Sequence, residues 1–316
     1  MWNGELNGTV CFQNTLLRPR PRLSTDSRFL AWWGRYAFAD GLFASIATGA
    51  NIFHVSADRV RSLPVTYRPL AAQRAIADFL DTETARIDAL ISRKHRMIEF
   101  LDQRLDASIR GRLHDVATWS PLKRRWVVDC KHRTPEYLDS GYPVVSPGDI
   151  SPGRIDLTRA HRFVGLGDYS DLADRPRRPK RGDIIYSRNA SIGIAAYVET
   201  DEPFCMGQDV CLITSTAESQ LFLAYALNTV GVDQPEAQKI GSTFSRVNVA
   251  QVLELMVPTP HHSVQCELAR VFDSMRRDRD HTAHAHTRQI ELLQEHRQAL
   301  ITAAVTGELD IPGVAA

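Results

Sequence analysis

Three polar segments carry side chains that are suited to reading base edges in DNA. CKHRTPEY at 130–137 concentrates polar groups ahead of a proline, and SRNASIG at 187–193 and GSTFSRVN at 241–248 do so elsewhere. Arginine pairs with guanine and asparagine with adenine through two hydrogen bonds in the major groove. The base-reading candidates are Lys131, His132, Arg133, Thr134, Ser187, Arg188, Asn189, Ser191, Ser242, Thr243 and Arg246.

A proline-rich basic segment is suited to phosphate contacts, which orient a protein on DNA without reading its sequence. RPRRPKR at 175–181 holds five positive charges in seven residues, and its prolines disfavour a helix. A second, smaller basic cluster begins at residue 123. A merely solvated loop explains the longer segment equally well. The phosphate candidates are Lys123, Arg124, Arg125, Arg177, Arg178, Lys180 and Arg181.

The motifs that mark cofactor sites and catalysis are missing from the sequence. It contains no GxxxxGK[ST] phosphate loop, no GxGxxG fingerprint and no CxxC or HExxH zinc spacing. The histidines at 281, 284 and 286 lie in a polar helical stretch, so we interpret them as a solvated face and expect no metal. Asp129 and Lys131 have the acid-x-Lys form of some nucleases, but no partner acid is evident. The sequence therefore favours a binding protein over an enzyme.

An internal repeat organises the elements that must position these residues. Residues 49–109 match residues 241–301 at a constant offset of 192, and 15 of the 61 positions are identical. The similarity continues upstream as Leu30/Phe222 and Trp33/Tyr225. A repeat of this length predicts a duplicated half-molecule with pseudo-two-fold symmetry.

Each half is predicted to contain a short strand followed by a long amphipathic helix. The strands are expected at 63–69 and 255–262, and apolar residues then recur at spacings of three, four or seven. The helices should run from about Leu70 to Leu113 and from about Ser263 to Val305. We expect them to pack as an antiparallel, coiled-coil-like pair; the alternative is that each helix packs on its own globular domain.

The segment between the helices has the pattern of a complete globular domain. Strands are expected at 142–146, 183–187, 192–198 and 210–214, and a helix at 219–227. The predicted class is α+β. The expected domains are a partial N-terminal domain at 1–68, a helix at 69–118, a complete domain at 119–260, and a helix with a tail at 261–316.

Composition limits the class of protein further. The chain has 316 residues, of which 43% are hydrophobic and 24% charged, with a net charge of +1. These values are typical of globular proteins and disfavour wholesale disorder. No apolar run approaches the length of a membrane span, and the N-terminus lacks the pattern of a signal peptide. We therefore expect a cytoplasmic protein whose five cysteines are reduced.

Two helical motifs and two loop motifs together resemble a known family. QRAIADFLDTETARIDALISRKHRMIEFLDQR at 73–104 resembles the central conserved region of type I restriction-modification specificity subunits. IELLQEHRQALITAAVTGELD at 290–310 is similar to their C-terminal conserved region. CKHRTPEYLDSGYPVVSPGDI and PKRGDIIYSRNASIG resemble one kind of their target recognition domains.

The resemblance implies a non-catalytic, DNA-binding subunit. Two target recognition domains would each read half of a bipartite sequence, and the two helices would set their spacing. Modification subunits with the adenine methyltransferase site would dock on the helices, and restriction subunits would cleave DNA. S-adenosylmethionine, ATP and Mg would then bind to those partner subunits only, and this chain would hold no cofactor.

The chain departs from the family at its N-terminus, where residues 1–68 match only part of a recognition domain. A gene fragment, a mis-assigned start, an exchangeable cassette or a separately encoded partner would each account for this. The alternative function is a truncated adaptor or decoy that binds modification subunits without full DNA recognition. A stand-alone nuclease that uses Asp129 and Lys131 is a third interpretation.

Overall fold

The computed structural model describes residues 11, 16–49, 53–216, 218–234 and 247–314. The chain divides into two compact units, one formed by residues 1–99 and 282–316, and one by residues 100–281. We call them unit 1 and unit 2. Within the described ranges, no helix combines the length and the apolar character that crossing a membrane requires.

Two helices of 45 residues contribute to both units. They are α4 (Leu70–His114) and α9 (His262–Thr306), and both ends of α9 lie 192 residues after the corresponding ends of α4. The repeat in the sequence therefore predicts the register of the long helices correctly. Buried apolar residues of the two helices share one core cluster in each unit, as the heptad-like spacing predicts.

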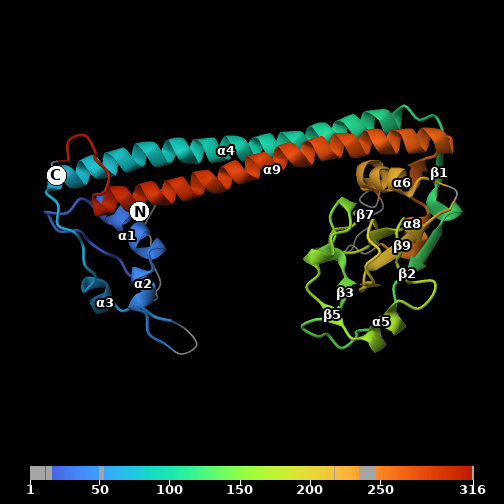
Figure 1. The fold of residues 1–316 in the computed structure, drawn as a ribbon, viewed down its shortest axis with the longest axis horizontal. Coiled ribbons are helices and arrows are strands. Elements are labelled where there is room, and N and C mark those ends of the chain that lie inside the picture. The colour runs from blue at the N-terminus through green and yellow to red at the C-terminus, as the bar shows by residue number, and fades with distance from the viewer. Residues whose placement is uncertain (1–10, 12–15, 50–52, 217, 235–246, 315–316) are drawn as a thin grey trace. The chain divides into compact units, whose positions relative to one another are not determined.

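Polar contacts show that α4 and α9 run antiparallel where they lie side by side in each unit (Figure 1). In unit 1, Arg297 Nε lies 3.0 Å from the Asp88 carboxylate. In unit 2, Arg279 forms an ion pair with Asp102. The residue number of the α4 partner rises from 88 to 102 between these two contacts, while that of the α9 partner falls from 297 to 279. The predicted antiparallel packing is therefore confirmed.

Unit 1 adds short helices to the long pair: α1 (Ser27–Ala39), α2 (Leu42–Ser45) and α3 (Ala57–Arg61). Asp26 caps α1 by accepting hydrogen bonds from the N–H groups of Arg28 and Phe29. The core of the unit joins the start of α4 to the end of α9. Its largest buried members are Phe29, Trp32, Trp33, Ile76, Leu80, Ile301 and Ile311.

The strand predicted at 63–69 is not formed, which corrects that expectation. Its counterpart in unit 2 is β10 (Met256–Pro258), which pairs antiparallel with β1 (Trp119–Pro121). Among the described residues, 63–69 form no ladder with another strand. A strand without a ladder partner is unstable in water, and Val65 is accordingly exposed.

Unit 2 contains a five-stranded sheet of order β2-β9-β6-β7-β4 and a three-stranded sheet of order β5-β3-β8. The first sheet consists of β2 (Trp126–Asp129), β9 (Val210–Thr214), β6 (Ile184–Ser187), β7 (Ala195–Tyr197) and β4 (Gly153–Arg154). The second consists of β5 (Phe163–Val164), β3 (Tyr142–Val145) and β8 (Cys205–Met206). The helices are α5 (Leu166–Leu172), α6 (Gln220–Ala226) with a π-helical extension (Leu227–Gly231), and α8 (Val249–Leu253).

Both faces of the five-stranded sheet are buried. Ile184 and Tyr186 of β6 pack with Leu223 of α6 on one face. Ile185 of the same strand packs with Phe204 and its neighbours on the other face. Successive side chains of a strand point to opposite faces, so a strand covered on both sides reads as a continuous apolar run. This explains why DIIYS and VCLIT predict their strands correctly.

The duplication extends to hydrogen bonds between the short helices and the long ones. In unit 1, Trp32 Nε1 of α1 donates to Asp81 of α4 at 2.9 Å. In unit 2, the Tyr225 hydroxyl of α6 donates to Asp273 of α9 at 3.2 Å. Asp81 and Asp273 differ by 192, whereas Trp32 and Tyr225 differ by 193. The upstream match of Trp33 to Tyr225 is therefore wrong by one residue.

Candidate nucleic-acid interface

The topology of unit 2 brings the ends of β2 and β6 to one edge of the sheet. Both strands pair antiparallel with β9, so they run parallel to each other, and β2 ends at Asp129 opposite Cys211 while β6 ends at Ser187 opposite Val210. The segments 130–137 and 187–193 leave the sheet from these ends. Two of the predicted base-reading segments are therefore neighbours.

Arg188 joins these two segments from the interior. Only 2% of its surface is exposed, and its Nη2 donates to the Asp129 carboxylate and lies 3.7 Å from Cys130 Sγ. Its backbone N–H donates to the Asp209 carbonyl at 2.8 Å. Ser187 is also fully buried, and its hydroxyl donates to the Asn189 carbonyl at 2.8 Å. Both side chains thus support the loop from within.

The other predicted base-reading residues are more accessible. Thr134 is exposed, and its hydroxyl accepts a hydrogen bond from Gln208 Nε2 at 3.1 Å. Asn189 is half-buried and donates to Asp209 at 3.1 Å. Ser191 is exposed. The predicted residues Ser242, Thr243 and Arg246 lie outside the described residues.

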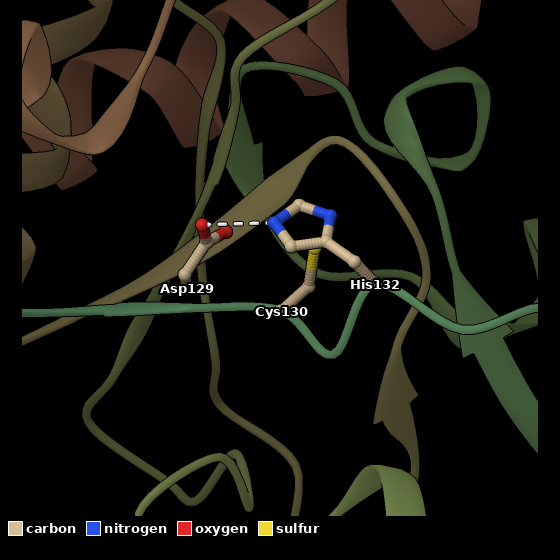
Figure 2. Close-up of side chains that lie close together, drawn as sticks. All are labelled: Asp129, Cys130 and His132. Atoms are coloured by element: carbon tan, nitrogen blue, oxygen red, sulfur yellow. Dashed lines mark hydrogen bonds and ion pairs between the residues drawn. The ribbon is translucent and has the colours of Figure 1, made fainter.

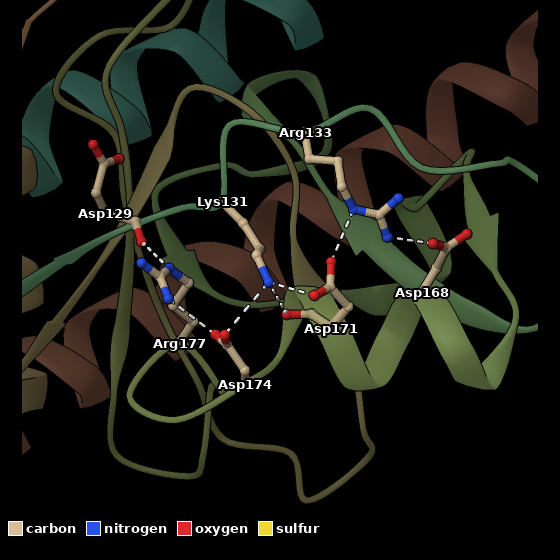
Figure 3. A network of polar contacts seen from close by, with 7 residues as sticks. All are labelled: Asp129, Lys131, Arg133, Asp168, Asp171, Asp174 and Arg177. Carbon is tan, nitrogen blue, oxygen red and sulfur yellow. Dashed lines mark hydrogen bonds and ion pairs between the residues drawn. The ribbon is translucent and has the colours of Figure 1, made fainter.

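Lys131 and Arg133 are held by carboxylates of α5 (Figure 3). Lys131 Nζ contacts Asp171, and Arg133 Nε donates to the other oxygen of Asp171 at 2.8 Å. Arg133 also forms an ion pair with Asp168. The hydrogen bond from Lys131 lowers the pKa of Asp171 and raises the pKa of Lys131. Both groups therefore stay charged at neutral pH.

The basic segment 175–181 reaches the same network through Arg177. Its Nε donates to the Asp129 carbonyl at 3.1 Å, and its Nη1 donates to Asp174 at 3.0 Å. Lys131 Nζ lies 3.5 Å from the other oxygen of Asp174. Figure 3 shows Asp174 between the two cations. One carboxylate thus connects a predicted base-reading segment to the predicted phosphate-binding segment.

The remaining cations of the basic segment are exposed. The guanidinium carbon of Arg178 lies 5.7 Å from the ring centre of Tyr169, within the range of a cation–π contact. Arg181 Nη2 lies 2.7 Å from the Asp201 carboxylate, and both side chains are exposed. Lys180 is exposed, and its backbone N–H donates to Asp183 at 3.0 Å.

The small cluster at 123–125 does not form a single basic surface. Lys123 is exposed and lies 3.8 Å from Glu254. Arg125 is buried, and its Nε donates to Glu218 at 2.7 Å. A buried guanidinium in an ion pair is poorly placed for a DNA phosphate, so we assign Arg125 a structural role instead. The side chain of Arg124 lies outside the described part of the chain.

Three acidic residues that were not among the predicted site residues connect these cations. Asp168, Asp171 and Asp174 are spaced three apart, so the first two lie on one face of α5, and the third follows its end. The available signal was GDYSDLAD directly ahead of the basic segment. An acidic run next to a basic run indicates local ion pairs, but its pairing with residues 131–133 requires the fold.

Asp129, Cys130 and His132 form a group whose possible ligand atoms all lie within 4.8 Å of one another (Figure 2). His132 Nε2 lies 3.1 Å from Asp129. Burial raises the pKa of the Cys130 thiol, which disfavours the thiolate that a metal would need. The guanidinium of Arg188 already contacts both Asp129 and Cys130. These side chains are better suited to an ion pair with Arg188 than to binding a metal.

Comparisons with known proteins identify the family. The family model described as the type I restriction modification DNA specificity domain matches residues 112–292. No curated protein matches the chain. One solved structure, described as showing complex assembly and conformational transition of the type I R-M system, is 16% identical with a TM-score of 0.69; the match covers 90% of this chain and 72% of that one.

A second solved structure is the HsdS subunit from Thermoanaerobacter tengcongensis. It is 15% identical with a TM-score of 0.49, and the match covers 90% of this chain and 71% of that one. At these identities the score of 0.69 shows a shared fold, whereas the family model covers more than half of the sequence. The chain therefore belongs to the family of type I restriction-modification DNA specificity subunits.

Proposed function

We propose that unit 2 binds duplex DNA through the surface at the ends of β2 and β6. This proposal rests on the convergence of basic and polar side chains at that edge of the sheet. Lys131 and Arg133 come from the loop after β2, Asn189 from the loop after β6, and Arg177 from the basic segment. Cations for phosphates and donors for base edges are the two classes of group that such an interface requires.

The proposed roles follow from exposure. Accessible polar side chains are the candidates for base edges: Lys131, His132, Arg133, Thr134, Asn189 and Ser191. Accessible cations of the basic regions are the candidates for phosphates: Lys123, Arg177, Arg178, Lys180 and Arg181. Arg188, Ser187 and Arg125 are buried, so we propose that they position the loops without contacting DNA.

Within a complete complex, this chain would supply recognition and no catalytic group. It would read half of a bipartite target and direct adenine methylation and restriction to it. S-adenosylmethionine, ATP and Mg would act on the modification and restriction subunits. Membership of a DNA specificity family supports this division of labour.

Methylome sequencing of cells with and without the gene tests the proposal. Loss of a bipartite methyladenine motif on deletion is the expected result. Restoration by the wild-type gene, but not by one that encodes Arg178→Ala, Lys180→Ala and Arg181→Ala, would assign recognition to this surface. An unchanged methylome would instead favour the truncated adaptor or decoy.

A further inference from the structure

One part of the proposed DNA-binding region is a network that holds as many carboxylates as cations. Ion pairs and hydrogen bonds connect its eight members, and Figure 3 shows all of them except Arg188. The cations are Lys131, Arg133, Arg177 and Arg188, and the carboxylates are Asp129, Asp168, Asp171 and Asp174. The formal charge of the network is therefore zero, although the segments that supply its cations read as basic.

We propose that Asp171 and Asp174 compete with DNA phosphates for Lys131, Arg133 and Arg177, and so lower the affinity of this surface for DNA of arbitrary sequence. The inference rests on the proposed DNA-binding function. It adds a pair of specificity-determining residues that need not touch a base. Asp171 holds two of the cations, and Asp174 holds Lys131 and Arg177.

The exposure of the network permits such an exchange. The side chains of Lys131 and Asp171 are 32% and 40% exposed, so a ligand can reach both. Ion pairs at such partly exposed positions are weak, so a phosphate can replace the carboxylate. A phosphate that displaced Asp171 would, however, remain beside that carboxylate and beside Asp174. The repulsion removes much of the gain from each new phosphate contact.

Sequence-specific binding overcomes this competition because it adds hydrogen bonds to base edges. Paired hydrogen bonds to base edges form with the target, whereas the base edges of arbitrary DNA do not match and its phosphates supply most of the contacts. The carboxylates therefore penalise arbitrary DNA more than the target. Such a penalty raises specificity without a new attractive contact.

The experiment measures binding of the full-length chain to a short mixed-sequence duplex between about 50 and 200 mM salt. The variants are Asp171→Asn, Asp174→Asn and the double substitution. Asp233→Asn is the matched control for the single substitutions, because it breaks an exposed ion pair with Arg110 on α4 and changes the net charge by the same amount. Thermal unfolding confirms that each variant is folded.

We expect the affinity of the Asp171 and Asp174 variants for this duplex to rise about three- to tenfold at low salt. The slope of log affinity against log salt should steepen by about 0.9 for each cation released to a phosphate. The control should match the wild type. Unchanged or weaker binding by the variants, or an equal gain in the control, overturns the inference. If the wild-type chain binds no duplex at any salt concentration, the DNA-binding proposal itself fails.

Discussion

Gln73 of α4 and Gln265 of α9 make the same hydrogen bond in the two halves of the molecule. Gln73 Nε2 donates to the Arg68 carbonyl at 2.8 Å, and Gln265 Nε2 donates to the Pro260 carbonyl at 2.9 Å. Each side-chain oxygen accepts the backbone N–H at the start of a short helix, from Asp26 and Ser219 respectively. Both glutamines are buried. Each therefore ties the chain entering a long helix to the helix that packs beside it.

Removal of either amide should destabilise its own unit. Gln265→Ala leaves the N–H of Ser219 and the carbonyl of Pro260 without this partner, at an expected cost of about 1–3 kcal/mol. Native-state hydrogen exchange should show the loss of stability in α6 for Gln265→Ala and in α1 for Gln73→Ala. Gln103→Ala, on the exposed face of α4, is the control. Equal losses in both units from a single substitution would contradict this assignment.

The sequence predicts the long helices well because their signal is long and repeated. The alignment of α1 with its counterpart α6 in the repeat is harder to predict. Leu30 and Phe29 are both apolar, and only packing shows that Phe29 is the buried counterpart of Phe222. The strand expected at 63–69 fails for a different reason. Its sequence matches that of β10, but β10 depends on pairing with β1, and local sequence does not report a partner strand.

Substitution of four accessible cations of the basic segment should weaken DNA binding for all sequences alike. Arg177→Ala, Arg178→Ala, Lys180→Ala and Arg181→Ala each remove one cation that is a candidate to neutralise a phosphate. The combined variant should flatten the salt slope by up to about 0.9 for each phosphate that is no longer neutralised. Fluorescence anisotropy with several duplexes measures this. Arg86→Ala with Arg288→Ala, two exposed arginines of the long helices, is the control. A slope equal to that of the wild type would show that these cations do not bind phosphates.

Loss of Asp129 should cost more stability than loss of an exposed carboxylate, because it leaves the guanidinium of Arg188 buried without this anion. Removal of one partner of a buried pair costs about 3–5 kcal/mol. The lower end is expected, since Asp129 is itself half-buried. Hydrogen exchange in β2 and β6 should show this loss for Asp129→Asn.

Two further variants test whether the unpaired guanidinium of Arg188 causes this loss of stability. Asp129→Asn with Arg188→Met should recover much of the stability, because the unpaired buried charge is gone. Asp233→Asn should cost less than about 1 kcal/mol, since its ion pair with Arg110 is exposed. If the double variant were less stable than Asp129→Asn alone, the guanidinium would not be the source of the cost.

The cysteines should differ sharply in reactivity. All five are free; Cys130, Cys205 and Cys211 are buried, whereas Cys11 is exposed and Cys266 is partly exposed. Burial raises the pKa of Cys205 to about 12 and also raises the pKa of Cys130 and Cys211. Since the thiolate is the nucleophile, these three thiols stay protonated and inert at neutral pH.

Iodoacetamide should therefore label two cysteines of the native protein and all five after unfolding. Peptide mass spectrometry identifies the labelled positions, and Cys11→Ser should remove one native label. Rapid native labelling of Cys130 would show that the loop after β2 opens.

The candidate site was only partly predictable, because residue type does not report exposure. Arg188 and Arg178 look equally suited to DNA in the sequence, yet the first is buried beneath a loop and the second is exposed. The burial of Arg188 follows from its place directly after the fully buried strand β6. The acids that hold Lys131 and Arg133 lie about 40 residues away in the chain, so no local pattern predicts their pairing.

The chain segments that make up each unit set an order in which the units can fold during synthesis. Unit 2 is one continuous stretch, residues 100–281, whereas unit 1 combines residues 1–99 with residues 282–316. Phe29, Trp32 and Leu80 pack against Ile301 and Val305 near the end of α9. Phe29 and Trp32 must therefore wait for Ile301 and Val305, which are translated later, before this core can form. All of unit 2 is translated before that part of α9, so unit 2 can close before unit 1.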